Sequence, residues 1–244
     1  MLILSESMLD ERHFQVLQAL VSEFTQTAEP VSSDALVEVL RLGVSPATMR
    51  TILRELAEAG YVEQPHTSAG RVPTDKGYSQ VLDHSEDQAV PMQELKALAA
   101  QFAQLQEEYR HLARATSKLL SRLTHAAAMS GYVSQRDWQE AGLREVLRQP
   151  EANSMATMRE MAEVMEDIDR YVTRGQLSDE ETQVFIGGEN PFFPAHYTSM
   201  VLRTTITPAQ EKVALVIIGP KRMFYQRNIA LVNALAALVK TTSL

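Results

Sequence analysis

Gln64-Pro-His-Thr-Ser-Ala-Gly-Arg-Val-Pro-Thr-Asp-Lys-Gly-Tyr78 contains a short loop that is bounded by prolines and centred on a glycine. The prolines stiffen both ends of the loop, and the glycine permits a tight bend between them. The loop carries side chains that donate hydrogen bonds to phosphate oxygens, namely His66, Thr67, Ser68 and Arg71. A stiff loop of this kind directly after a helix is typical of a winged helix, which predicts a DNA-binding protein.

The segment before the loop predicts a helix over Pro46–Ala59 with two distinct faces. Ser45 is suited to cap this helix, and a proline at the first helical position sacrifices no hydrogen bond. The apolar face follows the i, i+3, i+4, i+7 rule with Met49, Ile52, Leu53 and Leu56. The opposite face presents Ala47, Thr51, Arg54 and Glu58, flanked by Thr48 and Arg50. Small and hydrogen-bonding residues followed by arginines favour entry into a DNA major groove.

Two further amphipathic helices are expected before this one, over residues 10–27 and from Ser32 or Ser33 to Leu42. A short helix over 75–83 follows the loop. We therefore predict an N-terminal winged helix-turn-helix domain over residues 1–84. Its candidate DNA contacts are Ser45, Ala47, Thr48, Arg50, Thr51, Arg54, His66, Thr67, Ser68 and Arg71. Taken singly, an exposed amphipathic helix or a Pro/Gly loop is usually only a surface feature. Three helices followed directly by such a loop are less common together, and this order of elements favours DNA binding.

Composition narrows the classes of protein that remain. The 244 residues carry a net charge of −8, which argues against a protein that coats nucleic acid nonspecifically. Residues 1–84 are also acidic overall, but four of their cations, Arg50, Arg54, Arg71 and Lys76, lie within one short stretch. The absence of cysteine excludes disulfides, thiolate nucleophiles and cysteine-ligated zinc. We expect a cytoplasmic protein without a membrane partner, because no apolar run reaches membrane-spanning length and no signal peptide is recognisable.

An alternating spacing of three and four residues begins after a polar break at 84–91. It runs through Leu95, Leu98, Phe102, Leu105, Tyr109, Leu112, Thr116, Leu119, Leu123 and Ala126. This heptad pattern predicts one long helix over residues 92–128 and favours self-association through it. Phe102 and Tyr109 are bulky for a tight two-stranded seam, so the stripe could instead pack on a domain of the same chain.

Residues 129–142, which contain Gly131, Trp138 and Gly142, are interpreted as a linker. Residues 143–244 predict an α+β domain with a methionine-rich helix near 155–172 and a last helix over 226–240. Strands are expected at 183–187, 199–206 and 213–218. Three strands are too few for a stable sheet by themselves. The fold class of the whole chain is therefore α+β.

No arrangement of residues predicts catalysis. The six histidines lack metal-ligand spacing, and neither a Gly-x-Ser-x-Gly elbow nor a phosphate-binding Gly-x-x-x-x-Gly-Lys loop is present. The segments Gly187-Gly-Glu-Asn-Pro191 and Gly219-Pro-Lys-Arg222 are best interpreted as turns next to strands. We expect no enzymatic activity, no metal and no cofactor.

The motifs resemble those of the HrcA heat-inducible transcription repressors. The resemblance covers the opening loop together with Gly43-Val-Ser-Pro-Ala-Thr-Met-Arg50 and Glu55-Leu-x-x-x-Gly-Tyr61. It continues in Val146-Leu-Arg-Gln-Pro-Glu151, Ile186-Gly-Gly-Glu-Asn-Pro191 and Ile218-Gly-Pro-Lys-Arg-Met223. It implies a homodimer that binds double-stranded DNA at an inverted-repeat operator ahead of chaperone operons. It also implies derepression on heating and assistance from the GroEL chaperonin.

The chain departs from that family in its middle. The family carries a GAF-like domain with an inserted dimerising segment between the long helix and the Leu147-Arg-Gln-Pro-Glu151 motif, whereas here residues 126–143 form only a short bridge. Residues 143–244 are therefore expected to form a truncated GAF-like domain that lacks its opening strands and the insert. The heptad helix over 92–128 would then supply the dimer.

Two other functions remain open from the sequence. The first is a ligand-sensing winged-helix regulator of other genes, with an effector held by the C-terminal sheet. The second is a winged helix that contacts protein, which would show no salt-dependent binding to duplexes.

Overall fold

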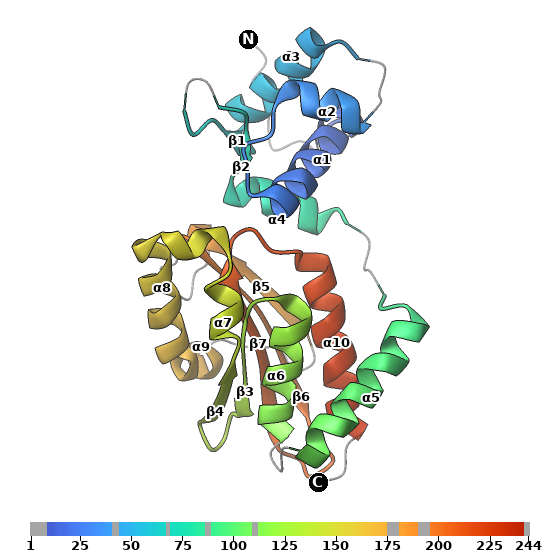
Figure 1. Cartoon of the computed structure of the whole chain (residues 1–244), viewed down its shortest axis with the longest axis vertical. Helices are drawn as coiled ribbons and strands as arrows, with labels where there is room; N and C mark the ends of the chain where they lie inside the picture. The colour runs from blue at the N-terminus through green and yellow to red at the C-terminus, as the bar shows by residue number, and fades with distance from the viewer. Residues whose placement is uncertain are drawn as a thin grey trace. The chain divides into compact units, whose positions relative to one another are not determined.

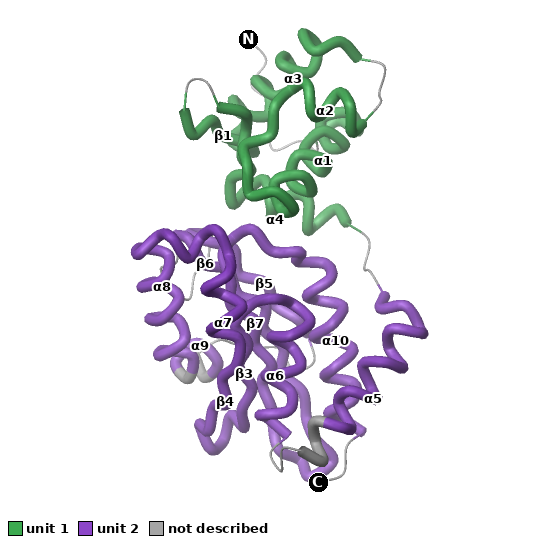
Figure 2. The backbone as a smooth tube through the Cα atoms, in the orientation of Figure 1, with its two compact units in different colours: residues 1–85 green, residues 86–244 purple. Residues whose placement is uncertain are grey.

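The computed structural model of the chain describes residues 9–40, 44–66, 69–85, 89–108, 112–174, 181–189 and 196–241. The chain forms two compact units, residues 1–85 and residues 86–244, which are coloured separately in Figure 2. We call them unit 1 and unit 2. None of the described helices is both long and apolar enough to cross a membrane.

Unit 1 is built from short helices and a small β-ribbon (Figure 1). Its elements are α1 (Glu11–Thr27), α2 (Ser33–Leu40), α3 (Pro46–Glu58), β1 (Val62–Glu63), β2 (Val72–Pro73) and α4 (Asp75–Asp83). Three of the helices begin at a side chain that accepts a hydrogen bond from a free backbone N–H, at Asp10, Ser45 and Thr74. The predicted helices are thus confirmed to within about two residues in the described part of this segment.

The core of unit 1 lies between the first three helices. α3 contributes Met49, Ile52, Leu53 and Leu56, each at most 4% exposed, as its apolar face predicts. Against them pack buried residues of the other elements, namely Val16, Leu17, Leu20, Val31, Leu36 and Val62. Because four residues of α3 are committed to this core, the opposite face of the helix is left exposed to solvent.

Unit 2 contains a five-stranded antiparallel sheet in the order β4-β3-β7-β6-β5. The strands are β3 (Ala127–Tyr132), β4 (Asp137–Ala141), β5 (Thr182–Ile186), β6 (Thr198–Ile206) and β7 (Lys212–Pro220). The helical segments are α5 (Met92–Glu108), α6 (Leu112–Thr124), α7 (Leu143–Val146), η1 (Pro150–Asn153), α8 (Met155–Glu166), α9 (Ile168–Arg174), η2 (Gly187–Glu189) and α10 (Tyr225–Thr241). α8 and α9 cover one face of the sheet, and α6 and α10 cover the other (Figure 1). The chain is therefore α+β, and unit 2 is consistent with a GAF-like domain.

The interpretation of residues 129–142 as a linker is wrong, because β3 and β4 form a hairpin there. β3 is buried because it pairs with β4 on one side and β7 on the other. Its small residues give no sign of this pairing in the sequence. Gly131 is a close-approach glycine: an added Cβ would come within 2.3 Å of the carbonyl oxygen of Asp137. The expected absence of opening strands is likewise wrong, and the sheet begins at Ala127, before the predicted boundary at 143.

The single heptad helix over 92–128 is also a wrong prediction. α5 ends at Glu108 and α6 begins at Leu112, and the two helices pack beside each other in unit 2 (Figure 1). The apolar stripe is already covered within the chain, since Leu98, Phe102, Leu112 and Leu119 are each at most 3% exposed. The alternative that the stripe packs on a domain of its own chain is the correct one. Tyr109 lies outside the described residues.

Two of the C-terminal motifs meet in unit 2. Nε of Arg222 donates to Oε1 of Glu151 at 2.8 Å, and one of its terminal nitrogens donates to Oε2 of the same carboxylate at 3.2 Å. The same terminal nitrogen reaches Oε1 of Gln149 at 3.0 Å. The Arg222 side chain is only 10% exposed. This bidentate pair fastens the turn after β7 to the segment before α8.

Candidate nucleic-acid interface

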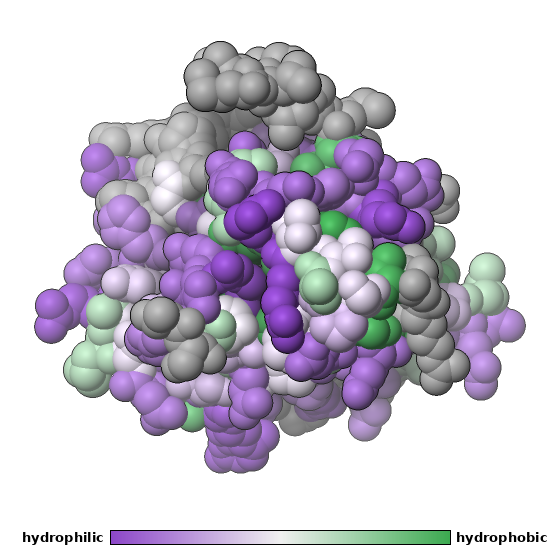
Figure 3. Space-filling model, turned by 90° about the horizontal axis from the view of Figure 1, so that it is seen from above, coloured by the Kyte–Doolittle hydropathy of each residue, from purple (hydrophilic) through white to green (hydrophobic). Residues whose placement is uncertain are grey.

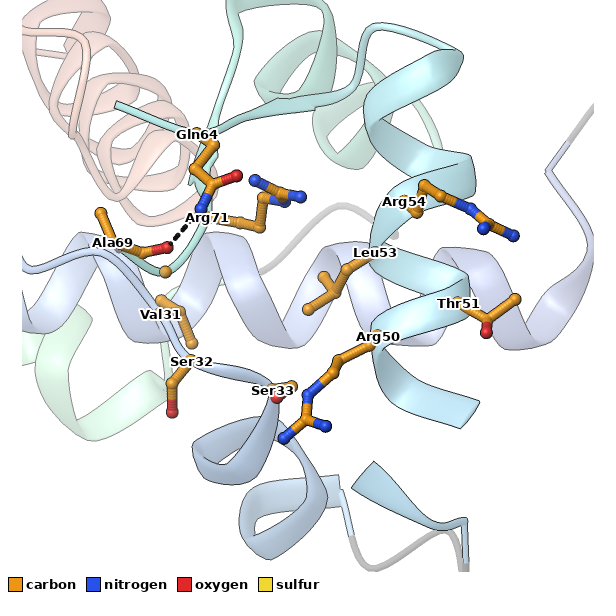
Figure 4. A pocket seen from close by; sticks show the side chains of 11 residues that line it. Val31, Ser32, Ser33, Arg50, Thr51, Leu53, Arg54, Gln64, Ala69 and Arg71 are labelled. Atoms are coloured by element: carbon orange, nitrogen blue, oxygen red, sulfur yellow. Dashed lines mark hydrogen bonds between the residues drawn. The ribbon is translucent and has the colours of Figure 1, made fainter. Parts of the chain in front are cut away.

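An open groove lies on unit 1 between α3, the start of α2 and the β1–β2 ribbon (Figure 4). Its cavity volume is about 520 Å³. The residues that line it are Val31, Ser32, Ser33, Arg50, Thr51, Leu53, Arg54, Gln64, Ala69, Gly70 and Arg71. Three arginines from two elements thus border one concave surface, which is suited to an anionic ligand.

The groove unites part of the predicted site. Arg50, Thr51, Arg54 and Arg71 all line it. Ala47 and Thr48 are exposed on the first turn of α3, and His66 is exposed on the loop. Thr67 and Ser68 lie outside the described residues.

Ser45 combines two roles at the start of α3. Its Oγ accepts the backbone N–H of Thr48 at 3.1 Å and lies 3.0 Å from Oγ1 of Thr48. Its side chain is exposed but already engaged in capping. We therefore regard Ser45 chiefly as the residue that orients the first turn of the helix.

The sequence did not single out Ser32, Ser33 and Gln64 as site residues. Ser32 and Ser33 were recognised only as helix caps, and Oγ of Ser32 does accept the backbone N–H of Ala35 at 3.1 Å. Gln64 opens the quoted motif, and its Nε2 donates to the carbonyl oxygen of Ala69 at 2.9 Å across the base of the loop. That position at the start of the motif was the only signal for it.

The position of the ribbon is fixed by a backbone bridge. The N–H of Val31 donates to the oxygen of Arg71 at 2.9 Å, and the N–H of Arg71 donates to the oxygen of Val31 at 2.8 Å. Val31 thereby forms an isolated antiparallel bridge beside the ribbon. Gly70 is required at this point, because a Cβ there would come within 2.3 Å of the Val31 oxygen.

The arginines of the groove are only loosely paired. A terminal nitrogen of Arg50 lies 3.9 Å from Asp34, and Nε of Arg54 lies 3.7 Å from Glu58. The side chains of Arg50 and Arg54 are 66% and 65% exposed, so these pairs contribute little and can open for a ligand. Arg71 forms no ion pair with any described residue.

Lys76, the fourth cation of the basic stretch, does not line the groove. Its Nζ donates to the carbonyl oxygen of Ala59 at 2.9 Å and lies 4.4 Å from the ring centroid of Tyr61. Lys76 therefore supports the C-terminal end of α3, where a cation satisfies a free carbonyl.

Figure 3 shows the molecule from above. Hydrophilic residues predominate on this face, and hydrophobic residues show only in small areas. The described residues on this face thus show no broad apolar patch of the kind that marks many protein-binding surfaces. Within the described residues, no cluster of three or more His, Asp and Glu side chains is placed to hold a metal ion.

His13 links α1 to the exposed side of α3. Its Nδ1 lies 2.8 Å from Oδ1 of Asp10, and its Nε2 lies 2.8 Å from Oε2 of Glu55. Burial by itself would lower the pKa of His13, but the hydrogen bonds and charges of Asp10 and Glu55 outweigh burial and raise the pKa. The hydrogen bond from the His13 backbone N–H, followed by that from its ring, lowers the pKa of Asp10. A protonated imidazole can donate to both carboxylates at once.

We expect unit 1 to lose stability as the pH rises through the raised pKa of His13. A side chain whose pKa is raised by folding stabilises the fold fully at pH values below its pKa in the unfolded chain, which is near 6.5 for His13. This stabilisation is lost at pH values above its pKa in the folded protein. Asp10 acts in the opposite direction, since its contribution is lost as the pH falls below about 4 through its lowered pKa. NMR titration of the His13 ring and urea unfolding followed by circular dichroism from roughly pH 2 to pH 9 measure both effects.

The control for this prediction is His13→Gln, which keeps a polar side chain but does not titrate. The difference in unfolding free energy between the two proteins should shrink toward alkaline pH. A constant difference, or a His13 pKa below the ordinary value, would contradict the ion-pair link.

Comparison with known proteins shows that the sequence is similar to one family of transcription repressors. The sequence profile of the HrcA protein C-terminal domain matches residues 80–229. A heat-inducible transcription repressor HrcA from Symbiobacterium thermophilum is 37% identical over 152 residues, which cover 62% of this chain and 44% of that protein. A protein of the same name from Beutenbergia cavernae is 40% identical over 168 residues, covering 68% of this chain and 46% of that protein. The matched part of the chain thus spans less than half the length of these relatives.

A solved structure has the same fold. A crystal structure described as that of a hypothetical protein superposes with a TM-score of 0.77 over 97% of this chain and 100% of its own, at 18% sequence identity. At this identity the likeness concerns the fold alone. It supports the arrangement of helices and sheet described above.

Proposed function

The chain belongs to the HrcA family, and from this premise we propose that it is a heat-inducible transcription repressor that binds an inverted-repeat operator as a dimer. Unit 1 serves as a winged helix, with α3 as the recognition helix and the β1–β2 ribbon as the wing. The observation that carries the proposal is the groove in which Arg50, Arg54 and Arg71 meet beside the exposed face of α3. None of the residues that line this groove is acidic, although the chain is acidic overall.

The mechanism is occupancy of the operator. Two copies of α3 enter successive major grooves on one side of the duplex, and the two-fold symmetry of the dimer requires a two-fold site. Ala47, Thr48, Thr51 and Arg54 face the base edges, and the ribbon with His66 and Arg71 follows the backbone. RNA polymerase is then blocked by steric overlap at chaperone operons.

The dimer forms through a surface other than the heptad stripe. Leu98, Phe102, Leu112 and Leu119 are already buried inside unit 2, so that stripe is not available to a second copy. Sedimentation of the whole chain with and without operator DNA tests the dimer. Release on heating and assistance from the GroEL chaperonin are further parts of this proposal, and both rest on the family alone.

The direct test is a gel-shift titration with DNA from upstream of chaperone genes, at growth temperature and at heat-shock temperature. We expect tight binding at the lower temperature and release at the higher one. Unrelated duplex of equal length should bind more weakly by about 1,000-fold or more. Binding should also weaken steeply with added salt, because phosphate contacts release counterions. Equal affinity for both duplexes, or none for either, would refute the proposal.

A further inference from the structure

The groove on unit 1 is rich in hydrogen-bond donors. Its rim carries the guanidinium groups of Arg50 and Arg71 and the hydroxyls of Ser32 and Ser33. The backbone carbonyls of the wall are already engaged, since the oxygens of Val31, Arg71 and Ala69 each accept a hydrogen bond within the protein. A phosphodiester presents only acceptors, whereas adenine and cytosine also present amino donors that require an acceptor. The chemistry of the groove therefore fits a phosphate better than a base edge.

The floor of the groove has a different character. Val31 and Leu53 lie there and are 3% and 4% exposed, so they present small areas of apolar surface between charged rims. A DNA backbone has the same alternation, because charged phosphates are separated by largely apolar sugars.

The walls of the groove are held in place by contacts within the protein before any ligand arrives. The backbone bridge between Val31 and Arg71, the Gln64–Ala69 hydrogen bond and the tight contact at Gly70 hold the ribbon against the segment before α2. A rigid seat orders few groups on binding and therefore loses little conformational entropy. This arrangement suits a contact that sets the register of a protein on its DNA.

Figure 4 separates the arginines by direction. Arg50 extends from α3 toward Ser33, and Arg71 extends from the ribbon toward α3. Thr51 and Arg54 also line the groove, but in this view their side chains extend away from Arg50 and Arg71. All three arginines thus border the groove, but the Arg54 side chain lies apart from the other two, beside Thr51.

From these observations we infer that the groove holds the sugar–phosphate backbone of one DNA strand. Arg50 and Arg71, helped by Ser32 and Ser33, bind phosphates at its two ends and fix the register of α3. Base reading falls to Thr51 and Arg54. This division of labour rests on the proposed DNA binding and assigns different tasks to arginines that share one surface.

The test compares two duplexes: one selected by the chain itself from a randomised pool, and one with the same bases scrambled. Fluorescence anisotropy gives the affinity of the full-length chain for each duplex over a series of salt concentrations. The variants are Arg50→Ala, Arg71→Ala and Arg54→Ala. The matched control is Arg170→Ala, which removes an exposed arginine of α9 in unit 2. Circular dichroism confirms that each variant is folded.

We expect Arg50→Ala and Arg71→Ala to weaken binding to both duplexes by the same factor. Each should also reduce the slope of log affinity against log salt by about 1. Arg54→Ala should weaken binding to the selected duplex by about 5- to 150-fold and so reduce the preference for it. The control should bind like the wild type.

Three results would overturn the inference while leaving the proposed function intact. One is a loss at Arg50 or Arg71 that is confined to the selected duplex, because that would make the residue a base reader. Another is an unchanged salt slope in both variants. The third has two parts: inorganic phosphate raises the melting temperature only when Arg50 and Arg71 are present, and DNA binding does not need either arginine. That result would assign the groove to a free anion. If the wild type binds neither duplex, the proposed function itself fails.

Discussion

Replacing Arg222 with alanine should destabilise unit 2 by about 3 kcal/mol, the low end of the loss expected on removing one partner of a buried ion pair, because the Arg222–Glu151 pair is partly exposed. The arginine side chain is 10% exposed and the Glu151 side chain is 26% exposed, so the carboxylate left behind would be partly buried without its partner. The hydrogen bond from Arg222 to Gln149 would be lost as well. The turn after β7 and the segment before α8 would then no longer be joined by these contacts.

Urea unfolding followed by tryptophan fluorescence measures this effect on unit 2 alone. The chain has a single tryptophan, Trp138, and it lies in β4 of the sheet. Arg148→Ala is the matched control, because Arg148 pairs with Glu145 at 3.2 Å but its side chain is 66% exposed. That substitution should cost no more than about 1 kcal/mol. Equal midpoints for the two variants would show that the buried pair contributes no more than a surface pair.

The helices of unit 1 can be predicted because their signals are local. Ser45 and Pro46 mark the start of α3, and its apolar residues repeat at the helical period. Each of these features acts within a few residues along the chain. The exposed face of α3 follows directly once its buried face is known, which is why Thr51 and Arg54 could be named from the sequence.

The sheet of unit 2 could not be predicted fully, since its inner strands depend on distant partners. β3 is rich in small residues and contains a glycine, which are features that resemble a linker. Its burial arises only when β7, more than 80 residues later, pairs along its length. The prediction of one long self-associating helix from the heptad stripe is wrong for a related reason. A spacing of three and four residues reveals an apolar face of a helix but does not show which element covers that face.

The groove of unit 1 also combines distant segments. Ser32 and Ser33 stand at the start of α2, and Arg71 lies after the loop. The Val31–Arg71 bridge helps to bring these segments to one surface. Sequence reasoning identified the arginines by residue type and place in the motif. It could not identify the serines, because capping already explained them.

Replacing Gly70 with alanine should open the groove and reduce operator binding by more than about tenfold, since a Cβ would overlap backbone that cannot move aside. The added atom would lie 2.3 Å from the oxygen and 2.5 Å from the carbonyl carbon of Val31. The backbone bridge between Val31 and Arg71 must therefore break. Two lost hydrogen bonds and the accompanying strain should destabilise unit 1 by about 2–4 kcal/mol.

Hydrogen exchange measures the local event independently of DNA. The amides of Val31 and Arg71 donate to each other's carbonyls, so both should lose protection in the variant. Trp138 fluorescence should report an unchanged unit 2. Gly60→Ala is the matched control: its φ is 80°, but an added Cβ meets nothing within 4 Å. It should cost only about 1–2 kcal/mol of backbone strain and leave both amides protected. If Gly70→Ala also leaves them protected, the wing is not held by this bridge, and any loss of DNA binding must have another cause.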